Sequence, residues 1–369
     1  MTTARWFAPG RVNLIGEHTD YNNGLCLPFA IPQGCTATVA SSDDPGVLLL
    51  SSAQETEPVR VPLADLDPAN ANGWTAYPLG VLWALREQGH LPEVPALRIH
   101  VDGDVPAGAG LSSSAALECS VAAAVSDLLG LDLSRSDLLT VTRQAENDYV
   151  GLPNGGLDQM ASLLCEPGHA LLADFSDLST RLVPLDAAAA GAAVLVVDTR
   201  APHQLTDGAY ANRRATCEAA ARELGVASLR DVDPASLGDS LSRLDDDDQR
   251  RVVRHVVTEN ERVRQTVTRL DRGDLWGIGD LLTASHVSLR DDFRVTIPEL
   301  DVAQEVLLDV GAAGARMTGG GFGGCVIALL PVGQVEAAAR EVVDVFAGQG
   351  FRAPAWFTAV PGPGAHPAG

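Results

Sequence analysis

The chain contains no lysine, so all 26 of its basic residues are arginine. A Walker P-loop needs a lysine on the β- and γ-phosphates, a protein kinase needs a strand lysine, and Schiff-base chemistry needs a side-chain amine. The absence of lysine therefore excludes these three mechanisms. If the chain handles nucleotide phosphates, backbone N–H groups, a divalent metal ion and arginine must supply the positive charge.

Long apolar segments and paired cysteines are also missing. The longest apolar run, Ala187–Val197, is about half of the ~20 residues needed to cross a bilayer. Residues Met1–Arg5 lead directly into an apolar segment and do not have the form of a signal peptide. The six cysteines are scattered without a Cys-x-x-Cys pair, which indicates buried thiols in a reducing compartment. We therefore expect a cytoplasmic protein.

Acidic residues outnumber basic ones, and the formal net charge is −22. This excess argues against a nucleic-acid or anionic-membrane surface. With 369 residues, of which 46% are hydrophobic and 20% charged, the chain is long enough for two globular domains. We expect the change of domain around residues 175–190.

The stretch Val105–Leu117 organises the rest of the chain. Gly108 and Gly110 give a tight turn, and three serines then lead into an alanine- and leucine-rich run that ends at Gly130. This pattern predicts a helix with the serines as its cap. Unpaired N–H groups at such a helix start attract phosphate. Taken alone, the segment fits a capped core helix equally well.

Residues 6–40 are typical of β structure, interrupted by the polar stretch 16–24. Within it, Asn23-Gly24 favours a type I′ hairpin turn. Glu17, His18 and Asp20 crowd several kinds of hydrogen-bonding group into four positions. Carbohydrate recognition needs such dense contacts, because buried hydroxyls left unpaired are costly. A polar surface turn is the alternative interpretation.

The remaining pattern alternates helices and strands. Gly319, Gly321 and Gly324 formally match GxGxxG, but an apolar strand follows them instead of a helix, which argues against a dinucleotide site. Asp158 follows glycine-rich backbone at the start of a short helix, where an ordinary N-cap would suffice. We predict helices over 74–88, 134–149, 159–164, 208–224, about 274–292 and 298–310, a long helix that begins at the four carboxylates 245–248 and runs to about 271, and strands over 47–50, 59–61, 97–101, 169–175, 192–197 and 325–330.

Three stretches together resemble one family. Pro9–Tyr21 (PGRVNLIGEHTDY) is similar to the galactokinase signature without a mismatch. Pro106–Leu117 is similar to the Gly/Ser-rich ATP loop of the GHMP small-molecule kinases, and Gly314–Cys325 resembles their third glycine motif. The resemblance spans residues 6–360. It implies a two-lobed α+β GHMP-kinase fold with mixed and antiparallel sheets, lobes at 1–175 and 176–369, and an active site in the cleft between them. It also allows the last strand to return to the N-terminal lobe.

The resemblance implies Mg²⁺-dependent phosphorylation of the anomeric C1 hydroxyl of galactose by ATP, giving galactose 1-phosphate. The implied partners are the two substrates, with no nucleic acid or membrane, and the chain is expected to be a monomer. The roles carried over are a catalytic pair, Arg11 and Asp158; sugar contacts, Glu17, His18, Asp20, Gly155 and Tyr210; an ATP loop, Gly108, Ala109, Gly110, Leu111, Ser112, Ser113 and Ser114; and Mg²⁺ ligands, Ser114 and Glu146.

Two points stay open at the level of sequence. Galactokinases usually have Cys-Gly and two aliphatic residues before the catalytic aspartate, whereas this chain has Asn154-Gly155-Gly156-Leu157. Asp158 could accept the proton of the sugar hydroxyl, which we favour, or orient that hydroxyl while Arg11 stabilises developing charge. The alternative functions are a related kinase for N-acetylgalactosamine or arabinose, and a catalytically silent galactose sensor.

Overall fold

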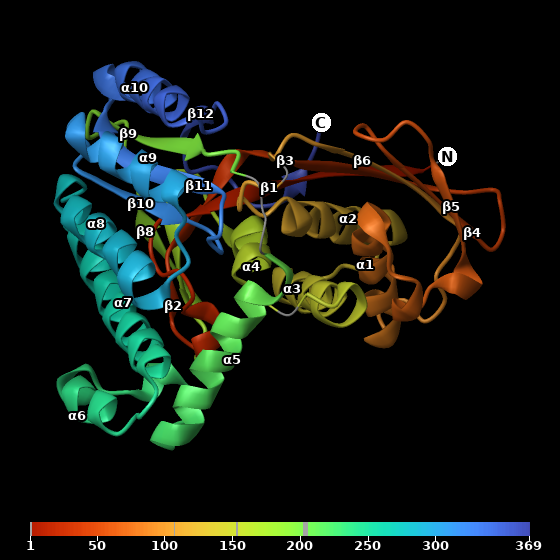
Figure 1. Ribbon diagram of the computed structural model, residues 1–369. Helices are drawn as coiled ribbons and strands as arrows, with labels where there is room; N and C mark the ends of the chain where they lie inside the picture. Colours follow the sequence, from red (N-terminus) through yellow and green to blue (C-terminus); the bar gives the residue numbers. More distant parts are fainter. Residues whose placement is uncertain (1, 107, 153, 202–205) are drawn as a thin grey trace.

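The computed structural model describes residues 2–106, 108–152, 154–201 and 206–369 (Figure 1). These residues form an α+β fold in which three sheets are covered by helices, as expected from the sequence. No described helix is long and apolar enough to cross a membrane.

The longest strands form a sheet of order β13-β1-β3-β6-β4-β5. Strands β4 and β6 pair in parallel and the other neighbours are antiparallel, so the sheet is mixed. The predicted β structure of residues 6–40 includes the two long strands β1 and β3, and a bulge between Pro9 and Arg11 lets β1 continue through a proline and a glycine. The strands are β1 (Thr3–Asn13), β3 (Pro28–Ser41), β4 (Val47–Ser52), β5 (Val59–Pro62), β6 (Leu97–Gly103) and β13 (His366–Pro367).

Helices pack against this sheet and carry its core. Helix α2 lies on β1 and β3, and its alanines bring its backbone close to the strands. Gly130 ends α2 in the left-handed conformation at φ 61, as predicted. A serine, Ser112, is the N-cap residue, as predicted, but at φ 64 its side chain makes no capping hydrogen bond. The helices are α1 (Ala76–Glu87), α2 (Ser113–Leu129), α3 (Arg135–Gln144) and α4 (Leu157–Leu164).

The second sheet, of order β10-β11-β9-β12, is antiparallel and lies in the C-terminal half. Alternate residues of β9 enter two different cores: Val194 and Val196 face one, and Leu195 and Val197 face the other. The strand predicted over 192–197 is thus present and is buried on both faces. The elements are β9 (Ala192–Asp198), β10 (Gly314–Thr318), β11 (Cys325–Pro331), β12 (Ala355–Ala359), α5 (Thr206–Leu224), α6 (Leu237–Ser242), α7 (Asp247–Asp271), α8 (Gly279–Ser288), α9 (Pro298–Asp309) and α10 (Val335–Gln349).

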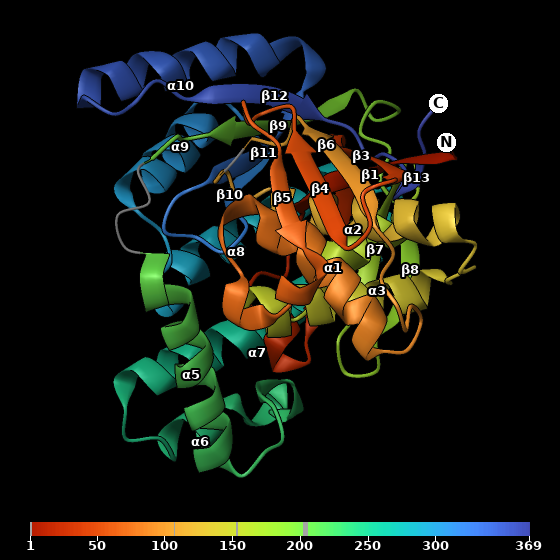
Figure 2. The ribbon, with the colours of Figure 1, turned by 90° about the vertical axis from the view of Figure 1, so that its right-hand side faces the viewer.

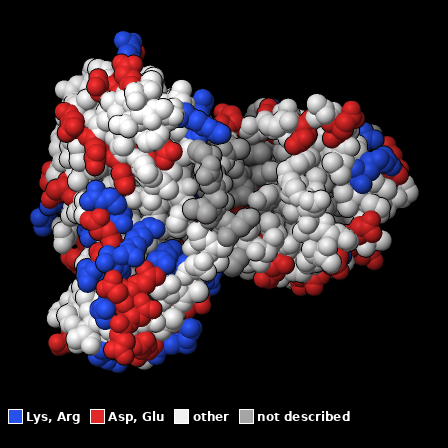
Figure 3. Space-filling model, in the orientation of Figure 1, with Lys and Arg blue, Asp and Glu red and all other residues white. Residues whose placement is uncertain are grey.

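In Figure 2, α10 runs along the sheet beside β12, and α5 and α6 project away from the sheets. Helix α10 has no counterpart in the sequence prediction. On the face drawn in Figure 3, acidic and basic side chains lie side by side over α5–α7. The excess of negative charge is therefore interspersed with arginine on that face.

The two halves share structure at two places. One core contains Val12 and Leu14 from the end of β1, together with Val196 of β9 and Val263 of α7. Strand β13 returns to pair with β1, so the chain ends beside its beginning (Figure 1). A small sheet contains β2 (Leu25–Cys26), β7 (His169–Asp174) and β8 (Ser179–Pro184), so its strands lie on both sides of residue 175 in the chain. The expected division into lobes at residue 175 stays a prediction.

The predicted Asn23-Gly24 hairpin turn is wrong. A 3₁₀ turn covers Asp20–Asn22 and ends at Asn23 with φ 56, and β2 then pairs with β7 rather than with β1. Asn23 thus uses its tolerance of the left-handed region to end a helical turn. The chain instead makes a wide connection between β1 and β3, which leaves room for the polar side chains of residues 14–24.

Candidate active site

A cleft of about 590 Å³ opens between the two halves, a size suited to small-molecule ligands. In the described part of the chain, four segments line it. They are the signature loop (residues 14–24), the serine loop (108–114), the connection from α3 to α4, which includes a π-turn, and the first turns of α5. The glycine hairpin (319–324), which joins β10 to β11, adds Gly319 and Gly320.

Arg11, on β1, connects the serine loop to Asp158. Its Nε lies 2.9 Å and its Nη2 2.6 Å from Asp158 Oδ1, and its Nη1 donates to the Gly110 carbonyl at 2.5 Å. The Arg11 backbone N–H also donates to the Leu111 carbonyl at 3.1 Å. Both contacts to the carboxylate use Oδ1, so Asp158 keeps Oδ2 for another partner. Asp158 lies in the first turn of α4, whose N-cap is Gly156, and the N-cap interpretation of Asp158 is therefore wrong.

The serine loop has the backbone shape of an anion site. Gly108, Gly110 and Ser112 have φ values of 72, 72 and 64, all in the left-handed region. Such a succession turns backbone N–H groups toward one side, and the uncapped start of α2 adds the positive end of its dipole. Ser112 adopts this conformation without being glycine, which costs energy and is typical of functional sites. The loop can therefore bind phosphate without a lysine.

Two buried carboxylates lie beside this loop. The α3 helix ends at Gln144 in a π-turn, Ala145–Val150, where the sequence predicted helix to 149. The wider turn is a frequent feature of functional sites and carries Glu146 into the cleft. Burial raises the pKa of Glu146 to about 7, and the charge of Asp158 acts in the same direction. Burial and the neighbouring Glu146 likewise raise the pKa of Glu118, on α2, well above its usual value.

Ser114 and Glu146 fit a Mg²⁺ ion. A hydroxyl and a carboxylate are the oxygen ligands that Mg²⁺ prefers. Among the described residues, neither Glu146 nor Glu118 forms an ion pair with an arginine, so these buried carboxylates lack a compensating cation. The same residues contain no group of three or more His, Cys, Asp or Glu side chains able to hold a metal by themselves. The ion would therefore complete its shell with substrate oxygens.

The signature loop places three of the expected sugar contacts in the cleft: Glu17, His18 and Asp20. His18 has φ 60, and its Nδ1 lies 2.9 Å from the Tyr21 hydroxyl. Its ring packs on Phe293 at a centroid distance of 4.5 Å. Burial lowers the pKa of His18 to about 3, so the ring is neutral at pH 7. Burial raises the pKa of Asp20 to about 6, and Asp20 Oδ2 accepts the Gly155 N–H at 3.2 Å.

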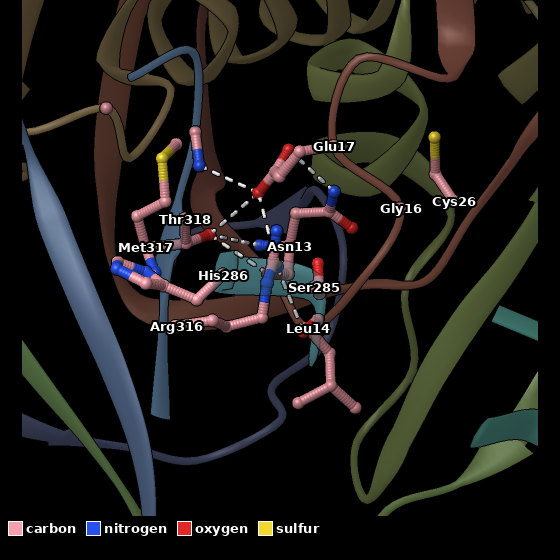
Figure 4. A network of polar contacts seen from close by, with 12 residues as sticks. Asn13, Leu14, Gly16, Glu17, Cys26, Ser285, His286, Arg316, Met317 and Thr318 are labelled. Carbon is pink, nitrogen blue, oxygen red and sulfur yellow. Dashed lines mark hydrogen bonds and ion pairs between the residues drawn. The ribbon is translucent and has the colours of Figure 1, made fainter. Parts of the chain in front are cut away.

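Glu17 connects the signature loop to the glycine hairpin (Figure 4). Its Oε2 accepts from Asn13 Nδ2 at 2.8 Å, and its Oε1 accepts from the Gly319 N–H at 2.8 Å. The fully buried Arg316 of β10 donates through Nη1 to the Asn13 and Leu14 carbonyls, each at 3.1 Å, and lies 3.5 Å from Glu17 Oε1. A buried ion pair of this kind fixes the loop in one register.

Helix α7 holds the same loop from the other side. Glu259 Oε1 accepts the Gly16 N–H at 3.0 Å, and His255 Nε2 lies 3.1 Å from the Glu17 carbonyl. Asn260 Oδ1 accepts the Leu25 N–H at 2.7 Å. The loop's backbone groups are thus satisfied by side chains more than 230 residues further along the chain.

Comparison with known proteins agrees with this geometry. The galactokinase galactose-binding signature matches residues 2–41, the GHMP kinases N terminal domain matches 76–166, and the GHMP kinases C terminal domain matches 266–348. The galactokinase of Streptomyces coelicolor is 53% identical over 98% of this chain and 93% of its own length. That of Mycobacterium tuberculosis is 44% identical over 98% and 99%. This chain belongs to the galactokinase family.

Solved structures support the same assignment. A galactokinase from Lactococcus lactis, complexed with galactose, superposes with a TM-score of 0.93 at 32% identity, over 99% of this chain and 95% of that one. A mevalonate kinase from Methanococcus jannaschii superposes with a TM-score of 0.67 at 16% identity, over 98% of each chain, and so shares the GHMP-kinase fold.

Most of the residues predicted from the family signature meet in the cleft. Ala109 belongs to the serine loop but is buried and does not line the cleft, and Gly155 lies beside the cleft through its N–H contact with Asp20. A Cβ at Gly155 would lie 2.3 Å from Asp20 Oδ2, so only glycine fits there. Further residues line the cleft or support it without having been assigned a role from the sequence, namely Tyr21, Glu118, Gly151, Leu152, Asn154, Leu157, Gln159, Gly208, Ala211, Arg214, Ala215, Glu218, His255, Glu259, Asn260, Phe293, Arg316, Thr318, Gly319 and Gly320.

Proposed function

We propose that this member of the galactokinase family transfers the γ-phosphoryl group of ATP directly to the C1 hydroxyl of galactose, forming galactose 1-phosphate and ADP. The observation that carries the proposal is the position of Arg11, which contacts Asp158 and the serine loop at the same time. A sugar hydroxyl at Asp158 and a phosphate on the serine loop would therefore be neighbours. Positioning of this kind supplies much of the catalysis of phosphoryl transfer.

Asp158 is the proposed acceptor of the hydroxyl proton. The transition state of phosphoryl transfer is loose, so the attacking hydroxyl loses its proton late and a moderate base is sufficient. Because Arg11 occupies Oδ1 of Asp158, the second oxygen is the proposed acceptor. The Arg11 guanidinium also lies where it can stabilise the negative charge that develops on the phosphoryl group.

The nucleotide is held by N–H groups of residues 108–114 around its β-phosphate. Ser114 and Glu146 are the proposed Mg²⁺ ligands. When bound, Mg²⁺ neutralises charge on the β- and γ-phosphate oxygens. On the sugar side, Glu17, His18, Asp20, the backbone at Gly155 and Tyr210 are the proposed contacts. Their neutral ring, carboxylates and N–H groups offer donors and acceptors for adjacent sugar hydroxyls.

A coupled assay of ADP release with galactose, glucose, N-acetylgalactosamine and arabinose side by side tests the proposal. We expect galactose to give by far the highest kcat/KM and the activity to disappear in excess EDTA. A clear preference for another sugar would assign a related kinase. ADP release with none of the sugars, despite galactose binding in calorimetry, would assign a silent sensor. We also propose that the working unit is a monomer, which light scattering of the active protein measures.

A further inference from the structure

The segment 154–159 does more than carry Asp158, because two of its carboxamides reach Glu146. Asn154 Nδ2 donates to Glu146 Oε2 at 2.5 Å, and Gln159 Nε2 donates to the same oxygen. Both hydrogen bonds are made to the proposed Mg²⁺ ligand from residues that flank Asp158 in the chain.

Gln159 also separates the two buried carboxyl groups. Its side chain is fully buried, and its Nε2 lies 3.2 Å from Glu118 Oε2 as well as in contact with Glu146 Oε2. A carboxamide nitrogen carries two N–H groups, so one can serve each carboxyl. No described arginine pairs with either carboxyl, so Glu146 is held from the protein side by hydrogen bonds alone: those from the two amides and one with Ser114, the other proposed Mg²⁺ ligand.

The two donors leave Glu146 with a defined orientation. Both use Oε2, so neither amide occupies Oε1. The backbone of the same segment is anchored as well: the Asn154 N–H donates to Asn147 Oδ1 at 2.8 Å, and the Gly155 N–H donates to Asp20 of the signature loop. This six-residue stretch thus contains the proposed base, Asp158, and contacts both the proposed metal ligand and the signature loop.

We propose that Asn154 and Gln159 are positioning residues that orient the Glu146 carboxylate for the metal ion of the nucleotide. This proposal rests on the metal role of Glu146 given under the proposed function. Hydrogen-bond partners of metal ligands restrict the ligand to its binding geometry, and losing one costs about 10–100-fold in metal affinity.

The test measures metal binding directly. Mn²⁺ is titrated into the full-length protein with ADP present, and free Mn²⁺ is followed by electron paramagnetic resonance, for wild type, Asn154→Ala and Gln159→Met. We expect each substitution to weaken Mn²⁺ binding by about tenfold or more. The KM for galactose should remain unchanged, and the Mg²⁺ concentration for half-maximal rate should rise in parallel with the loss of Mn²⁺ affinity. Thermal unfolding reports whether each variant is folded.

Gln265→Ala is the matched control, because it removes an exposed carboxamide donor to a glutamate on α7, Glu261, and leaves both amide donors to Glu146 intact. It should bind Mn²⁺ as the wild type does. If Asn154→Ala is folded and binds Mn²⁺ with wild-type affinity, the positioning proposal is overturned. If Gln159→Met does not fold, the Mn²⁺ affinity of Asn154→Ala alone tests the proposal. A wild-type enzyme that is fully active in EDTA overturns instead the metal role on which the proposal rests.

Discussion

The signature loop and the serine loop line one cleft, but the protein holds them by opposite means. Side chains that are distant in sequence bind the backbone of the signature loop, among them Glu259, His255 and Arg316. The serine loop presents mainly its own backbone, bent through three left-handed residues, and Arg11 is the charged side chain that binds it. The sugar side is therefore fixed before any ligand arrives.

The difference reflects what each loop is proposed to bind. Neighbouring sugar hydroxyls are told apart by rigid donors and acceptors in fixed places, because a mismatch leaves buried groups unpaired. A phosphate needs several N–H groups at close range, and glycine allows that approach because it has no side chain. A chain without lysine depends on this backbone arrangement for positive potential. Substitutions that affect the signature loop should therefore change mainly the KM for galactose, and those that affect the serine loop mainly the KM for ATP.

The largest expected effect is at Asp158, between the two loops. Asp158→Asn keeps the shape of the side chain but removes the proton acceptor, so we expect kcat to fall about 10²–10⁴-fold. Galactose affinity should be retained, because the signature loop is held independently of Asp158. Steady-state kinetics and calorimetry with galactose measure the two quantities. Turnover close to that of the wild type would remove Asp158 from the mechanism.

Arg316→Met tests how the signature loop is fixed. Removing one partner of a buried ion pair leaves the other charge unmatched, and we expect a loss of about 3–5 kcal/mol in the free energy of unfolding. The KM for galactose should rise more than the KM for ATP, since Arg316 contacts Asn13, Leu14 and Glu17. Urea denaturation and steady-state kinetics measure both effects.

The control for Arg316→Met is Arg264→Met, which breaks an exposed ion pair with Glu261 on α7. Exposed pairs contribute about 0–1 kcal/mol, so this variant should resemble the wild type. Equal losses for the two variants would show that the buried pair has no special role.

His255→Gln tests the same support through pH. Burial lowers the pKa of His255 to about 4 from its ordinary value of 6.5, so below pH 6.5 the unfolded chain binds a proton that the folded chain does not. Folding stability is therefore lost as pH falls from about 6.5 toward 4. At pH 5 this group accounts for about 2 kcal/mol of that loss.

In His255→Gln this loss disappears. The free energy of unfolding at pH 5 minus that at pH 7, measured by urea denaturation, should therefore be about 2 kcal/mol higher in the variant than in the wild type. Burial raises the pKa values of Asp20 and Glu146 and gives pH effects of opposite sign, but both are present in each protein and cancel in the comparison. An equal pH dependence of the two proteins would contradict the prediction.

The smallest effect is expected where the glycine hairpin meets the serine loop. Gly319 has φ +90, and a Cβ there would lie 2.8 Å from the Gly110 carbonyl oxygen. Gly319→Ala should cost about 1–2 kcal/mol of backbone strain and raise the KM for ATP more than that for galactose. Gly46 has φ +78, and a Cβ there would have no neighbour within 4 Å, so Gly46→Ala is the matched control. That variant should lose similar stability and keep both KM values.

Residue types and near neighbours alone were enough to predict the local parts of this protein. The apolar run of β9, the Gly130 stop of α2 and the lysine-free Gly/Ser loop follow from them, and the family motifs located the residues that line the cleft. Asn23-Gly24 misled the prediction because a left-handed residue ends a 3₁₀ turn as well as it makes a hairpin. The π-turn at Glu146 was missed because its backbone hydrogen bonds span five residues instead of the four of an α-helix, and the two have the same sequence pattern.

The side chains that support the site from a distance became apparent only once the chain was folded. Glu259 and His255 belong to an amphipathic helix whose pattern says nothing of a loop 240 residues away, and Arg316 is a charged residue in a strand that becomes fully buried. The bond from Asn154 to Glu146 likewise depends on how a loop folds back on a π-turn. Such contacts arise from the packing of whole elements, and short-range sequence patterns carry no record of them.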